Sequence, residues 1–109
     1  DLSPVENCLH LKMLDVSSNK ISDICCLKKL TRITYFSFSR NNVKDISVLK
    51  YMPNIRHLTL SANPCLRDLK VLKELKNIEY VEAANLDLGP YQKSALLADH
   101  PGCTFVWSL

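Results

Sequence analysis

Glycine is scarce in this chain of 109 residues, which contains only Gly89 and Gly102, far apart in the sequence. Rossmann and P-loop nucleotide sites place two or three glycines at short, fixed spacing, so both classes lose their main signal. No apolar run reaches the roughly 20 residues that a membrane span needs, and residues 1–6 lack the order of a signal peptide. The sequence therefore predicts a soluble protein without a membrane partner.

The chain also lacks a large excess of either positive or negative charge. Fourteen lysines and arginines against eleven aspartates and glutamates leave a formal net charge of +3. Nucleic-acid binding requires basic residues gathered on one face, so this small excess argues against such a partner. Hydrophobic residues make up 47% of the chain, which predicts one modest globular or repeat domain.

The cysteines form neither a disulfide framework nor a zinc motif. Their count is odd, one pair is adjacent, and no C-x-x-C spacing occurs. They are Cys8, Cys25, Cys26, Cys65 and Cys103. We interpret them as small apolar residues in a reducing compartment, the cytoplasm or the nucleus.

A pattern of apolar residues recurs every 22 or 23 residues. Each unit begins at an aspartate and carries apolar residues at +1, +4, +7 and +10, followed by two more at +13 and +15. The starting aspartates are Asp1, Asp23, Asp45 and Asp68, and the first three units end in Asn19, Asn41 and Asn63. Self-similarity at this period predicts a stacked repeat.

Each half of the unit predicts a different element. Residues 33–38 alternate apolar and polar, which indicates a short strand, and such strands should stack in parallel. Asp45–Met52 places apolar residues three apart behind an aspartate, which favours a short 3₁₀ or α turn with the aspartate as N-cap. Residues 68–76 predict a fuller α-helix. The repeated asparagine predicts a ladder of buried amides that satisfy backbone groups.

These motifs resemble leucine-rich repeats. The matching segments are Leu11-x-x-Leu14-x-Val16-x-x-Asn19, Ile33-x-x-Phe36-x-Phe38-x-x-Asn41 and Ile55-x-x-Leu58-x-Leu60-x-x-Asn63. The 22-residue length is similar to that of the short class whose prototype is a regulatory subunit of a type-one protein phosphatase, and bacterial internalins share a similar period. The resemblance implies an α/β repeat solenoid with parallel strands on the concave face and short 3₁₀ or α turns on the convex face.

The resemblance covers residues 1–88, which we expect to form about four coils, the first incomplete. In the fourth unit Leu86 stands where asparagine is expected, and Asn85 lies one place early, which indicates that the array is ending. Residues 89–109 resemble the C-terminal cap of eukaryotic leucine-rich arrays, with a helix that starts at Pro90 and a last strand over 104–107. Core positions filled from Leu2 onward predict further repeats or a cap upstream in the intact protein.

The strand residues that point away from the core form rows across the concave face. Aromatic anchors carry much of the binding energy of protein interfaces, so we predict that two of these rows bind a partner. The first row is Met13, Tyr35, His57 and Tyr80, and the second is Asp15, Ser37, Thr59 and Glu82. The alternative is that strand propensity alone explains the two tyrosines.

Catalytic and metal-binding constellations are not evident. His10, His57 and His100 occupy different register positions, which argues against a metal site, and no serine or cysteine has a histidine and an acid at triad spacing. We therefore predict no enzymatic activity, no cofactor and no small-molecule substrate.

Basic residues collect on the predicted convex segments and their rims. They are Lys28, Lys29, Arg32, Lys50, Arg67, Lys70, Lys73 and Lys76. Such positions are usually a solvated surface. The alternative is a secondary contact with an acidic protein, tubulin or RNA, but no interleaved aromatics support single-strand nucleic-acid binding there.

The sequence thus predicts a protein-interaction scaffold or regulatory module that binds another protein on its concave face. The resemblance implies intracellular roles in phosphatase regulation, ribonucleoprotein assembly or ciliary dynein complexes, hence a cytoplasmic location with nuclear and ciliary variants. Two alternatives stay open. One is an outward-facing recognition domain that resembles internalins, and the other is the targeting half of a larger enzyme.

Overall fold

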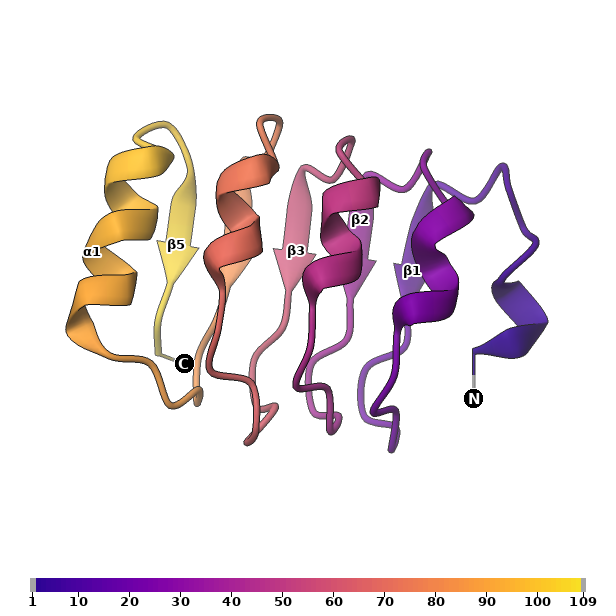
Figure 1. The fold of residues 1–109 in the computed structure, drawn as a ribbon, viewed down its shortest axis with the longest axis horizontal. Coiled ribbons are helices and arrows are strands. Elements are labelled where there is room, and N and C mark those ends of the chain that lie inside the picture. Colours follow the sequence, from indigo (N-terminus) through magenta and orange to yellow (C-terminus); the bar gives the residue numbers. More distant parts are fainter. Residues whose placement is uncertain (1, 109) are drawn as a thin grey trace.

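The computed structural model describes residues 2–108, which stack as successive coils along one axis (Figure 1). On one side a single parallel sheet runs in chain order, and on the other side short helices line up (Figure 1). The strands are β1 (Met13–Asp15), β2 (Tyr35–Ser37), β3 (His57–Thr59), β4 (Tyr80–Glu82) and β5 (Thr104–Val106). The helices are η1 (Ser3–Val5), η2 (Cys25–Lys29), η3 (Ser47–Tyr51), η4 (Lys70–Glu74) and α1 (Pro90–Asp99).

The strands pair without any slip in register. Met13 lies opposite Tyr35, Tyr35 opposite His57, and His57 opposite Tyr80, with Thr104 beyond. The extra residue of the third unit is absorbed in the turn around Pro64, because residues on both sides of it keep their columns. Equivalent side chains of neighbouring coils therefore pile onto one another, as the repeat predicts.

The convex helices η2, η3 and η4 are all 3₁₀ helices of five residues. Three residues per turn bring side chains three apart into one row, and Leu69, Leu72 and Leu75 all point into the core with no exposed surface. The α-helix predicted over residues 68–76 is wrong for this reason. An α-helix would rotate these leucines out of a single row, and the coil needs them in line.

The aspartates that open the second, third and fourth units do not occupy the N-cap position that we predicted, and Asp1 lies outside the described residues. Ile24, Ile46 and Leu69 hold that position, without a side-chain cap. The aspartate lies one residue earlier and accepts the backbone N–H of the first helical residue. The N···Oδ1 distances are 2.8 Å from Cys25 to Asp23 and 2.9 Å from Ser47 to Asp45. This Asx turn still satisfies a free N–H at the helix start.

The core is a set of columns that run the length of the stack. Each coil contributes the aliphatic residues of its strand and of its 3₁₀ helix, and Phe36 and Phe38 are the largest side chains that are fully buried. Their rings lie 4.9 Å apart in a tilted arrangement. Because every coil buries its apolar face against its neighbours, burial in this core depends on stacking rather than on any one coil.

Asn41 and Asn63 join each coil to the one before it. The Asn41 amide donates to the carbonyls of Phe38 and Ser39 in its own coil and to that of Val16 in the preceding coil, and its oxygen accepts the N–H of Ile21. Asn63 repeats this arrangement, with its oxygen accepting the N–H of Val43. Both side chains are buried. They form the rungs of a ladder of amides.

Asn19 differs from the buried asparagine that the repeat predicts. Its side chain is exposed and donates to the carbonyls of Val16 and Ser17, both in its own coil. The physical reason is its position in the first described coil, where its amide makes only local contacts.

The residue before each ladder position has a left-handed backbone. The φ angles are 60° at Ser18, 60° at Arg40, 56° at Ala62 and 55° at Asn85. The fourth coil therefore keeps the turn of the first three. It places an asparagine at the left-handed position, where that residue costs less than most others, and gives up the ladder amide to Leu86.

The C-terminal segment covers the last coil. Strand β5 pairs with β4, and α1 lies beside η4 (Figure 1). The Gln92 side chain accepts the N–H of Leu69 and donates to the carbonyl of Arg67, while His100 Nε2 lies 2.7 Å from the carbonyl oxygen of Leu72. Leu96, Phe105 and Trp107 pack against the core. The segment therefore packs against the fourth coil on both its strand side and its helix side.

Replacing Asn41 with alanine should lower the free energy of unfolding by about 2–4 kcal/mol, because several buried backbone groups lose their partner at once. Asn19→Ala is the matched control, since the same amide is exposed there, and it should cost less than about 1 kcal/mol. Urea unfolding followed by circular dichroism measures both. Equal losses at the two positions would contradict the ladder.

Acid should loosen the convex turns. The backbone N–H of Cys25 lowers the pKa of Asp23 below its ordinary value of 3.8, and the backbone N–H of Ser47 does the same for Asp45. A lowered folded-state pKa stabilises the protein above the unfolded pKa, and this stabilisation disappears as the pH falls through the folded value. Carboxyl NMR titration should give midpoints below 3.8 for both, and Asp45→Asn should flatten the acid limb of the stability curve.

Candidate functional site

The first predicted row forms a continuous stack of rings on the sheet. The Tyr35 and His57 ring centroids are 4.5 Å apart at an interplanar angle of 20°, and those of His57 and Tyr80 are 4.4 Å apart at 15°. The three rings are half-buried. The in-register strands cause this stack, because adjacent strands are spaced about 4.8 Å apart, close to the distance between the centroids of offset-stacked rings. The structure therefore brings these three residues together.

Stacking determines which parts of the rings a partner can reach. Both faces of the His57 imidazole are covered by tyrosines, so its accessible surface is its edge. Ring edges carry partial positive charge, and phenol hydroxyls add donors and acceptors. Met13 continues the row at the N-terminal side with 63% of its surface exposed. The row offers an apolar strip with polar points along its outer side.

The middle of the second row is buried in the sheet surface. Ser37 and Thr59 are only 5% and 9% exposed, and their hydroxyls bond to each other. The Ser17 and Ser37 oxygens lie 2.5 Å apart, which extends this chain of hydroxyls into the first coil. These two predicted contact residues therefore offer a partner little surface. Their small size leaves the ring stack standing higher on the sheet.

The two acids of the second row lie at opposite ends of it. Asp15 is exposed and accepts the backbone N–H of Ser17 at 3.0 Å, a bond that lowers the pKa of its carboxyl. Glu82 is half-buried and accepts the Ser61 hydroxyl at 2.8 Å, while Ser61 accepts the N–H of Ala84. Both carboxylates are held by the protein itself. They place negative charge at the two ends of the row next to the ring stack.

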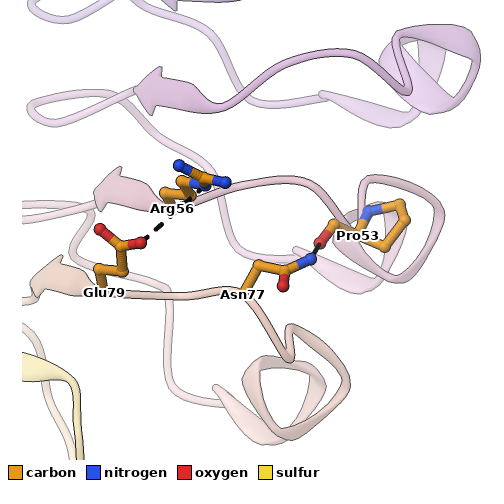
Figure 2. A network of polar contacts seen from close by, with 4 residues as sticks. All are labelled: Pro53, Arg56, Asn77 and Glu79. Atoms are coloured by element: carbon orange, nitrogen blue, oxygen red, sulfur yellow. Dashed lines mark hydrogen bonds and ion pairs between the residues drawn. The ribbon is translucent and has the colours of Figure 1, made fainter.

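A second asparagine ladder lies at the rim, where the convex helices lead into the strands. Asn54 donates to the carbonyl of Thr31 at 2.8 Å, and Asn77 donates to that of Pro53 at 3.1 Å. Figure 2 shows the second of these rungs beside the ion pair of Arg56 and Glu79, whose Nε and Oε2 are 3.9 Å apart. Sequence reasoning missed this ladder. The signal was the recurrence of asparagine nine residues after Asp45 and Asp68.

The remaining histidines have structural neighbours. Arg32 donates to Nδ1 of His10 at 3.0 Å, also at the rim, and His100 packs under α1 near Phe105. Within residues 2–108 no group of three or more histidines, cysteines, aspartates or glutamates could hold a metal ion.

Lysines mark the convex side. Lys28, Lys50 and Lys73 occupy equivalent positions in η2, η3 and η4, and all three are exposed. Arg67 pairs with Asp87, with 3.5 Å between Nε and Oδ2. Among the described residues, no helix is long and apolar enough to cross a membrane.

Known proteins share this architecture. Residues 31–82 match the model of leucine-rich repeats in two copies. An internalin of Listeria monocytogenes, InlF, superposes with a TM-score of 0.91 at 26% identity, over 99% of this chain and 32% of its own. Internalin C2 of the same species superposes with a TM-score of 0.87 at 24% sequence identity. The match covers 97% of this chain and 45% of internalin C2. A leucine-rich-repeat protein of Leptospira interrogans superposes with a TM-score of 0.79 at 22% sequence identity. The match covers 89% of this chain and 25% of that protein.

The chain spans less than half the length of these structures. No curated protein sequence matches the chain significantly. Leucine-rich-repeat proteins of the internalin type are generally protein-interaction modules and typically not enzymes. With the repeat model, the register and the superpositions in agreement, residues 31–82 contain leucine-rich repeats, and the described chain has the leucine-rich-repeat fold.

Proposed function

We propose that the chain is a protein-interaction scaffold or regulatory module whose partner binds on the concave strand face. The observation that carries this proposal is the stack of Tyr35, His57 and Tyr80, with Met13 beside it. A strip of aromatic edges with two carboxylates in the neighbouring row combines apolar area with fixed polar points. Interface centres have this composition.

Rigidity supports the proposal. The strands are tied by in-register pairing, by the amides of Asn41 and Asn63, and by the hydroxyl chain of the second row. Among the described side chains, no buried nitrogen or oxygen lacks a hydrogen-bond partner. A surface held in this way loses little conformational freedom on binding. The partner then bears most of the ordering cost.

An outward-facing recognition domain is the second candidate. The superposition on InlF over nearly the whole chain favours it, since that protein is an internalin. The targeting half of a larger enzyme is a further alternative, because the chain spans only part of its structural relatives. Both use the same concave surface. They differ in the compartment in which the chain would act and in whether a catalytic domain would be attached to it.

We infer that the repeats belong to the short 22-residue class with phosphatase-regulatory resemblance, and that residues 89–109 act as a cap. The unit length and the packing of Leu96, Phe105 and Trp107 on the last coil support these inferences. A cytoplasmic location, with nuclear or ciliary variants, fits the five free cysteines. Cytoskeletal and ciliary complexes are among the partners that this class implies.

A double variant, Tyr35→Ala with Tyr80→Ala, should lose the bound partner in affinity capture from native lysate. Removing two anchors of a central strip typically weakens an interface by at least tenfold, roughly. Recovery of partner proteins by mass spectrometry, relative to the unchanged chain, is the readout. Thermal unfolding establishes that the variant is folded.

Tyr51→Ala with Tyr91→Ala is the matched control. These two tyrosines are 51% and 89% exposed and lie on the convex side and on α1, so the same side chains are removed from other surfaces. This control should recover the partners in full. Met13→Asp tests the strip without touching the stack, and it should also reduce recovery. Unchanged recovery with both concave variants would refute the proposal.

The cysteines separate the two candidate locations. Protein isolated from its own cells with rapid alkylation should carry five modified thiols, because a reducing compartment keeps cysteines free. In the native state Cys103 should react most slowly, since desolvation first and Glu79 second raise the pKa of its thiol to about 11. Mass spectrometry counts the labels. Disulfide-linked peptides would favour the outward-facing candidate.

A further inference from the structure

The rim beside the ring stack holds a basic depression of about 290 Å³. Its lining joins three cations with neutral polar side chains and includes no carboxylate. The lining residues are Lys12, Arg32, Thr34, Asn54, Arg56 and Asn77. Four successive coils supply them, and the three cations come from the first three of these coils. In a chain whose net charge is only +3, this local gathering of positive charge stands out.

Arg32 and Arg56 each use one guanidinium nitrogen in a contact within the protein, and their other nitrogens stay accessible. Arg32 uses Nη1 to donate to His10, and Arg56 approaches Glu79 through Nε at 3.9 Å, a long contact between largely exposed groups. Figure 2 shows Arg56 lying across the rim from Asn77, with the outer end of its guanidinium away from Glu79. Arginine presents five N–H donors in a planar fork, so donors remain for an incoming anion.

The second asparagine ladder gives this depression a rigid base. Asn54 and Asn77 each hold a carbonyl of the preceding coil, and Thr34 donates to the carbonyl of Lys12. The coils are thereby locked in the spacing that sets Arg32 near Lys12 and Arg56. A site built on such fixed elements keeps its geometry without a ligand.

The charge and the donors fit phosphate better than carboxylate. A phosphorylated side chain carries about −1.5 to −2 charges and three acceptor oxygens, and forked arginines bind it through paired hydrogen bonds. A carboxylate offers one charge and two oxygens, which leaves the charge of two of the three cations unmatched. Thr34 and Arg56 directly precede Tyr35 and His57, so an anion at the rim lies beside the ring stack.

We propose that the depression formed by Lys12, Arg32 and Arg56 binds a phosphorylated side chain of the protein that occupies the concave face. This inference rests on the proposed function for the partner, but the anion site itself stands on the rim residues alone. Glu79 acts as a built-in competitor, because its carboxylate shares the Arg56 guanidinium. Its removal should free a fork for the phosphate.

The probes are five-residue peptides with a central phosphotyrosine, phosphoserine, glutamate or unmodified tyrosine, flanked by glycines. NMR titration follows the Nε–H signals of Arg32 and Arg56. Both phosphopeptides should shift these signals and bind at least about tenfold more tightly than the tyrosine and glutamate peptides. Arg56→Ala and Arg32→Ala should each lower the affinity for the phosphopeptides about tenfold. Glu79→Gln should raise that affinity about threefold.

Lys50→Ala is the matched control, since it removes one exposed positive charge from the convex side, and it should change the affinity by less than about twofold. Equal loss with Lys50→Ala would show diffuse charge attraction and overturn the site. Equal binding of the glutamate and phosphoserine peptides, or tighter binding of a five-nucleotide RNA, would overturn the phosphoprotein assignment. Tyr35→Ala with Tyr80→Ala should leave peptide binding within about twofold, so a failed concave face and a failed anion site give different results.

Discussion

The structure depends on satisfying the backbone where each strand turns back toward the convex side. At that turn some backbone groups pair directly between coils, as the N–H of Asn42 does with the carbonyl of Ile21, but the N–H groups of Ile21 and Val43 bond to a side-chain amide instead. Asn41 and Asn63 supply the missing bonds, and each reaches into the preceding coil as well as its own. Strand pairing sets the spacing of the coils, and a short amide at one fixed position ties neighbouring coils together at the turn. An aliphatic residue there would leave several buried groups unpaired.

Fixed spacing has direct consequences on the concave side. Strands that stack without slip bring identical register positions together, so Tyr35, His57 and Tyr80 meet face to face. The same spacing allows the hydroxyls of Ser17, Ser37 and Thr59 to bond in a chain. The sheet surface thus consists of a row of buried hydroxyls that hydrogen-bond to one another and, beside it, a raised strip of stacked rings. A partner would meet the strip first.

The rim and the convex side carry the charge. Lysines in equivalent positions of η2, η3 and η4 face outward, where water screens them. At the rim, by contrast, the second ladder of Asn54 and Asn77 holds side chains of four coils around one depression. Convergence of cations on a rigid base gives directional donors for an anion. The concave strip and the rim together offer adjacent sites of different chemistry.

Periodicity in the sequence by itself determined the repeat, the parallel strands, the columns of the core and the row of Tyr35, His57 and Tyr80, because a fixed period places equivalent residues in register. It could not decide which hydroxyls would be buried, that residues 70–74 form a 3₁₀ helix, that Asn19 is exposed, or that Asn85 takes the left-handed position. Those outcomes depend on contacts between coils, and the rim depression draws its residues from four of them. Only the tertiary structure brings such separated residues together.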